Sequence, residues 1–149
     1  MLLENNRLIF KREDLLEEEV LKCRKGKEFE ERYLRKGFLN KITVYRILDS
    51  RRERFNAYKD KVDVINVITA PEIEMLIILN EGKYSEFKKI GKKPSDYCKI
   101  KLKYGNVKNY EFVKKYFSNI DVLINSIHEY SRITRIRDSE KTIGDLLSY

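Results

Sequence analysis

The chain has 149 residues, of which 42% are hydrophobic and 38% are charged, and its formal net charge is +8. This length suits a single domain over residues 1–149, and the low glycine and proline content excludes a collagen-like chain. Cys23 and Cys98 have no histidine or second cysteine at metal-ligand spacing, so we expect neither disulfides nor a zinc site, and a cytoplasmic location. The longest strongly apolar run, Met75–Leu79, is too short to cross a membrane, so no membrane partner is expected.

The first half of the chain predicts helix and then strand. Residues 12–36 carry apolar side chains at loosely helical spacing, which predicts one or two helices with Gly26 and Gly37 as breakpoints. Residues 42–48 are β-branched and aromatic, and residues 62–68 alternate apolar and polar side chains, so both predict strands. The polar residues 49–55 between them predict a loop that leads into a short helix.

The second half predicts a series of helices. Thr69-Ala70-Pro71-Glu72 has the form of a capping box and predicts a buried helix that starts at residue 70 and ends at Gly82. Further helical segments are expected at about 83–90, 94–103, 109–117, 119–130 and 142–148. The predicted fold class is therefore α/β, with a small sheet of a few strands and a mostly helical C-terminal half.

The positive charge is concentrated in residues 82–116, which contain eleven lysines and three acidic residues. The net charge of this stretch is +8, equal to that of the whole chain. Lysines neutralise phosphates and aromatic rings can stack on unpaired bases, so this stretch favours a nucleic-acid partner. The candidate binding residues, which include two arginines of the loop after the first strand, are Lys88, Lys89, Lys92, Lys93, Lys99, Lys101, Lys103, Tyr97, Tyr104, Arg51 and Arg52. The alternative carries equal weight: the lysines solvate the outer faces of short helices while the aromatic side chains fill the core.

Residues for catalysis are sparse. His128 is the only histidine, and there is no glycine-rich phosphate loop or paired-histidine metal motif. Asp49 closes the first predicted strand, and Glu72 and Glu74 follow the second, at the carboxyl ends where ligands bind in open α/β sheets. Each has a structural alternative: Asp49 as a helix cap, Glu72 as part of the capping box, and Glu74 as a first-turn acid favoured by the helix dipole.

Two segments resemble motifs of a known family. The run from Pro71 to Leu79 follows a strand ending in Val67-Ile68-Thr69 and precedes Tyr97-Cys98-Lys99. This run resembles the RloB-like family, whose members carry a proline, an apolar residue, a glutamate and a leucine-rich helix, with a Tyr-x-Lys further on. Residues 26–34 resemble the first motif of the same family, a glycine with a glutamate four residues later and a tyrosine three beyond that.

The resemblance implies a Toprim-type domain of a prokaryotic restriction or phage-defence locus. In such domains a glutamate and an Asp-x-Asp pair hold divalent metal for phosphodiester chemistry. Here Lys25 stands at the glutamate position and Arg51 at the second aspartate, and a cation in place of a ligand repels a metal ion. The resemblance leaves Asp49 and Glu74 as the remaining catalytic and Mg²⁺-binding pair.

Three functions stay open. The first is a nucleic-acid-binding module without catalysis, which needs no cofactor. The second is an Mg²⁺-dependent nuclease that uses Asp49 and Glu74. The third is a protein-interaction or inhibitory module with a basic face. An unpaired edge in so small a sheet also makes a homodimer plausible.

Overall fold

The computed structural model describes residues 1–18, 20–21, 23, 25–35, 37, 41–48, 62–69, 72–134 and 141–148. Within these residues three parallel strands form one sheet in the order β1 (Ile42–Leu48), β2 (Val62–Ile68) and β3 (Lys141–Thr142). Ile42 pairs with Val62 and Leu48 with Ile68, and β3 pairs with the last two residues of β2. The carboxyl ends of β1 and β2 therefore lie at one edge of the sheet.

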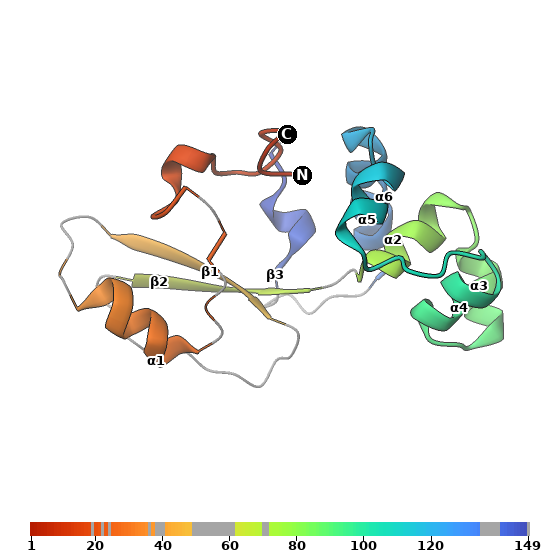
Figure 1. Cartoon of the computed structure of the whole chain (residues 1–149), viewed down its shortest axis with the longest axis horizontal. Helices are drawn as coiled ribbons and strands as arrows, with labels where there is room; N and C mark the ends of the chain where they lie inside the picture. Colours follow the sequence, from red (N-terminus) through yellow and green to blue (C-terminus); the bar gives the residue numbers. More distant parts are fainter. Residues whose placement is uncertain are drawn as a thin grey trace.

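One face of the sheet is covered by α1 (Gly26–Phe29), which continues as a π-helical turn, η2 (Glu30–Leu34). Phe29, Leu34 and Val62 are buried together there and form a small core. Near the N-terminus lies a short 3-10 turn, η1 (Arg12–Asp14), and the Phe10 ring stacks on Tyr45 of β1 with centroids 5.3 Å apart. Figure 1 shows the sheet and α1 together at the left of the molecule.

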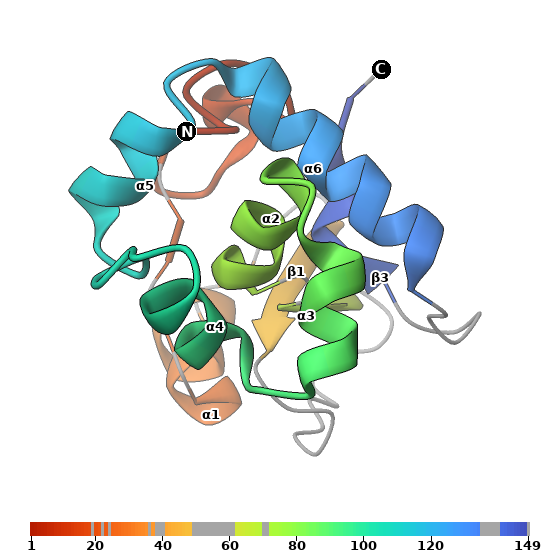
Figure 2. The same cartoon turned by 90° about the vertical axis from the view of Figure 1, so that its right-hand side faces the viewer.

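The second and larger core belongs to the helices that follow β2. They are α2 (Ile73–Asn80), α3 (Tyr84–Ile90), α4 (Pro94–Ile100), α5 (Tyr110–Tyr116) and α6 (Ile120–Ile133). Ile77 and Ile78 of α2 have no exposed surface and pack with Tyr97, Cys98 and Phe117. Figure 2 shows α2 at the centre with the other four helices around it, which explains why α2 is apolar on nearly all sides.

The chain returns from α6 to the sheet through β3 and a last 3-10 turn, η3 (Ile143–Leu146). Its end pairs with the N-terminal segment: the Ser148 amide donates to the Arg7 carbonyl at 3.1 Å, and Leu8 and Leu147 form an antiparallel bridge. No helix within the described part of the chain is long and apolar enough to cross a membrane.

The α/β class, both predicted strands and the helical C-terminal half are confirmed. The predicted capping box is wrong, because α2 begins at Ile73 with Glu72 as its N-cap and no side-chain cap bond. The Thr69 hydroxyl instead donates a hydrogen bond to the carbonyl of Leu48, the last residue of β1, at 3.1 Å. The helix expected at 142–148 is confirmed only as a 3-10 turn, η3 (Ile143–Leu146), and Thr142 belongs to β3 instead.

Candidate nucleic-acid interface

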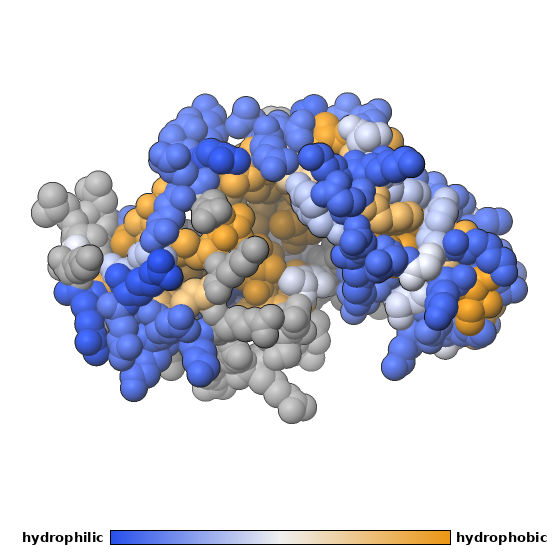
Figure 3. Space-filling model, in the orientation of Figure 1, coloured by the Kyte–Doolittle hydropathy of each residue, from blue (hydrophilic) through white to orange (hydrophobic). Residues whose placement is uncertain are grey.

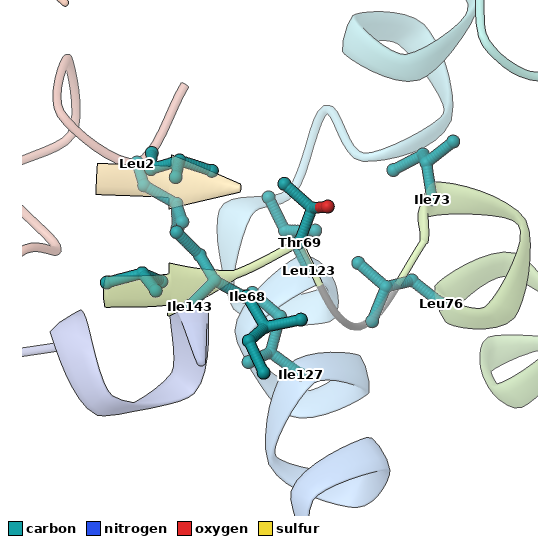
Figure 4. A pocket seen from close by; sticks show the side chains of 10 residues that line it. Leu2, Ile68, Thr69, Ile73, Leu76, Leu123, Ile127 and Ile143 are labelled. Carbon is teal, nitrogen blue, oxygen red and sulfur yellow. The ribbon is translucent and has the colours of Figure 1, made fainter. Parts of the chain in front are cut away.

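The carboxyl ends of β1 and β2 meet an apolar cavity. It has a volume of about 210 Å³ and is lined by aliphatic side chains of both strands, α2, α6, η3 and the N-terminal segment. Among the lining residues that the structure describes, Thr69 is the one polar residue, and Figure 4 shows it beside the aliphatic side chains. In Figure 3 apolar residues likewise gather in the hollow between the sheet and the helices. Asp49, Arg51 and Arg52, which the sequence places at this edge, lie outside the described residues.

Glu74, the other candidate metal ligand, is fully buried in the helical core. Lys108 Nζ lies 3.1 Å from its Oε1 and forms an ion pair with it, while neither carboxylate oxygen accepts a hydrogen bond from the described residues. Mg²⁺ keeps several waters and needs open oxygen ligands. A carboxylate with no exposed surface and an ammonium group beside it does not fit that ion.

No group of three or more histidine, cysteine, aspartate or glutamate side chains is placed to hold a metal ion among the residues that the structure describes. His128 is exposed on α6. The geometry around Glu74 therefore gives the nuclease prediction no support.

The lysine-rich stretch folds largely as a hairpin of two helices, α3 and α4. Gly91, which caps α3, has a φ of 66°, a left-handed conformation that glycine adopts without strain. Pro94 then opens α4, where its missing N–H costs nothing. The two helices are held together by an edge-to-face contact between Phe87 and Tyr97, with ring centroids 5.4 Å apart.

Seven lysines of residues 84–103 are exposed, and we call them the hairpin lysines: Lys88, Lys89, Lys92, Lys93, Lys99, Lys101 and Lys103. Glu86, one of the two acids in this range, lies 3.9 Å from Lys83, just outside the hairpin. Within the described part of the chain, no carboxylate lies within ion-pair distance of any hairpin lysine, although Lys88 sits over the ring of Tyr84 at 5.8 Å. The described acidic side chains thus leave the charges of the hairpin lysines unpaired and exposed to solvent.

Most aromatic side chains of residues 82–116 are buried or half-buried, and the exception is Tyr110, which is 55% exposed. Tyr97 and Phe117 have no exposed surface, so we leave Tyr97 out of the candidate interface. Tyr104 packs against Phe112 and Tyr116, with centroids 5.5 and 5.9 Å away. These aromatic side chains therefore fill the core, which is the structural alternative to a role in binding bases.

A partly buried polar contact joins this aromatic cluster to the end of α2. Glu81 Oε1 accepts hydrogen bonds from the hydroxyls of Tyr116 at 2.6 Å and Tyr104 at 3.1 Å, and Asn80 donates its side-chain amide to Tyr116 at 2.9 Å. Burial raises the pKa of Tyr116 and Tyr104 above the usual value of 10.0, and the Glu81 carboxylate adds to the rise. Both phenols therefore stay protonated donors at neutral pH.

Cys98 lies beside Glu74 in the same core and is fully buried. Its thiol is 3.7 Å from the Glu74 carbonyl oxygen. Burial, together with the charge of Glu74, raises the pKa of the Cys98 thiol to about 11. A thiol in this state is a structural group and a poor nucleophile.

Sequence reasoning missed three features of this region: the Glu74–Lys108 ion pair, the role of Glu81 as a shared acceptor, and the backbone of Lys103, whose φ is 63°. The two side-chain contacts join residues at least 23 positions apart, so no local pattern marks them. Lys103 follows a helix end, a place where a left-handed residue is common, but glycine would have been the signal.

A search of protein-family models, curated proteins and solved structures finds no match to this chain. The resemblance to the RloB-like family therefore stays a prediction, and any function has to be argued from the residues themselves.

Proposed function

We propose that this protein binds nucleic acid through the hairpin lysines and does not cleave it. The observation that carries the proposal is the presence of seven exposed lysines in twenty consecutive residues, with no acid paired to them among the described residues. Such a group creates a local positive potential, and the release of counterions from nucleic acid then drives binding. Cleavage is not proposed because the described acids do not assemble a metal site.

The test is a salt titration of binding to fluorescent DNA and RNA oligonucleotides, single- and double-stranded. Each phosphate contact makes log Kd rise by about 0.9 per tenfold rise in salt for a duplex. Replacing Lys92 and Lys93 with glutamate should therefore weaken binding at about 0.1 M salt by roughly 50-fold and lower the salt slope by about two. Adding Lys88→Glu and Lys89→Glu should bring the loss to about 10³ or more.

A matched control changes the net charge equally at another place. Lys25 and Lys27, at the start of α1, are also exposed, and replacing both with glutamate should cost much less affinity. Equal loss in the two double variants would show that net charge alone matters and would contradict the proposal. Absence of binding to any oligonucleotide at about 50 mM salt would reject nucleic acid as the partner, and an acidic protein would then be the next ligand to test.

Addition of Mg²⁺ and of EDTA to the same reactions, with products separated by length, tests the second half of the proposal. We expect intact oligonucleotides in both. Cleavage that EDTA stops would contradict the proposal and favour the nuclease alternative.

A further inference from the structure

We infer that the hairpin lysines recognise only the phosphate backbone, so that the protein binds nucleic acid of any base sequence and makes no contact with the bases. This inference rests on the proposed function and specifies its ligand: the repeating phosphates, with the bases left free. Three observations carry it: the side-chain types of the hairpin, the inward position of its aromatic rings, and the chemistry of lysine itself.

The hairpin lacks the planar side chains that read the edges of guanine and adenine. Residues 84–103 contain no arginine, asparagine, glutamine or histidine. Arginine pairs with guanine, and asparagine and glutamine with adenine, through two parallel hydrogen bonds that define the base. A lysine ammonium is a compact point charge without this planar geometry, and it contacts phosphates irrespective of sequence.

The three aromatic rings of the hairpin, Tyr84, Phe87 and Tyr97, are half-buried or buried. Tyr97 is fully buried, and Phe87 packs with its ring against Tyr97. Tyr84 lies beneath the Lys88 ammonium group. Stacking on a base needs an exposed ring face, and proteins that bind unpaired strands through their bases present several.

Among the residues that the structure describes, the one exposed aromatic side chain lies outside the hairpin. Tyr110, at the start of α5, has 55% of its surface exposed. Its exposed ring could stack on a base, so its replacement supplies a control.

The decisive experiment compares an oligonucleotide with an abasic oligomer of the same length, in which every sugar phosphate is kept and every base is removed. Full-length protein is titrated against both at about 50 mM salt, together with three duplexes of unrelated sequence. We expect the abasic oligomer to bind within about threefold of the base-bearing strand, and the three duplexes to agree within the same factor, because phosphate contacts are independent of sequence. Tyr110→Ala should leave the affinity unchanged.

The outcomes separate the inference from the proposed function. If the base-bearing strand binds and the abasic oligomer binds more than tenfold more weakly, base stacking takes part and the inference is wrong while the proposed function stands. A tenfold loss of affinity in Tyr110→Ala, or a tenfold preference for one of the three duplexes, would also overturn the inference. If neither oligomer binds, the proposed function fails and the inference fails with it.

Discussion

Lys103 combines an exposed charge with an unfavourable backbone. Its φ of 63° is in the left-handed region, where a side chain costs about 1 kcal/mol that glycine does not incur. The conformation reverses the chain after α4, so that the Leu102 and Tyr104 amides donate back to the carbonyls of Tyr97 and Cys98 at 3.4 and 3.0 Å. A lysine at a position suited to glycine supports a role for its side chain in binding.

Replacing Lys103 with glycine should therefore separate stability from binding. We expect the free energy of unfolding to stay unchanged or to rise by up to about 1 kcal/mol, since relief of strain is partly offset by the greater freedom of glycine in the unfolded chain. Affinity for DNA at about 0.1 M salt should fall roughly five- to tenfold through loss of one phosphate contact. Urea unfolding and a fluorescence binding titration measure the two quantities.

Lys103→Ala is the control for this experiment, because alanine removes the charge but keeps the left-handed strain. It should lose as much affinity as the glycine variant without any gain in stability. Full affinity in both variants would remove Lys103 from the interface. A clear loss of stability in Lys103→Gly would contradict the role given to its backbone.

Among the elements, α2 and α5 are joined by the hydrogen bonds between Tyr116, Glu81 and Asn80. Tyr116→Phe removes the shared hydroxyl and leaves the partly buried Glu81 with one fewer donor. It should lower the free energy of unfolding at pH 7 by about 1–2 kcal/mol. Tyr110→Phe is the matched control, because the Tyr110 hydroxyl makes no hydrogen bond to the described residues and its loss should change stability little.

The raised pKa of Tyr116 gives the same variant a pH signature. In the folded state the pKa lies above the ordinary 10.0, so the folded protein holds this proton more tightly than the unfolded chain. The resulting stability is fully present below about pH 10 and is lost as the pH rises above it. Urea unfolding between pH 7 and pH 11 should show a shallower loss above pH 10 in Tyr116→Phe than in the native sequence, and equal slopes would contradict the cause assigned to the shift.

An element could be predicted where the residues that determine it are close together in the sequence. The strands at 42–48 and 62–68 carry their β-branched and alternating residues within seven positions, and the structure confirms both. β3 has two residues, Lys141 and Thr142, and forms only because β2 offers it a free edge, so no sequence period marks it. Thr69 was assigned to a helix cap on local pattern, whereas its hydroxyl bonds to Leu48, 21 positions earlier.

The candidate interface was predictable in part for the same reason. The exposure of the lysines was predictable, because burying a charged ammonium group is unfavourable and the sequence shows where the lysines are. The position of each tyrosine depends on which face of a short helix meets the core. That choice for Tyr97 and Tyr104 is set by contacts with Phe87, Phe112 and Glu81, which become neighbours only in the fold.

In the whole molecule, the C-terminal segment joins the two cores. β3 extends the sheet, while Leu147, 4% exposed, packs in the helical core and bridges to Leu8. Leu147→Ala should therefore destabilise the whole chain, by about 2–4 kcal/mol, through the loss of buried surface and the cavity that remains. Leu16→Ala is the matched control, because Leu16 is 56% exposed and its truncation should cost little.

Cys98 provides a probe of whether the two cores unfold together. Its thiol is buried in the helical core and has a pKa raised to about 11, so a thiol reagent should modify it only after unfolding. In a Cys23→Ser background, the urea midpoint for labelling of Cys98 should equal the midpoint from far-ultraviolet circular dichroism, as in a two-state transition. Leu147→Ala should shift both midpoints downward by the same amount. If circular dichroism shifts while labelling of Cys98 does not, the helical core is stable without the C-terminal segment, and the role assigned to Leu147 is wrong.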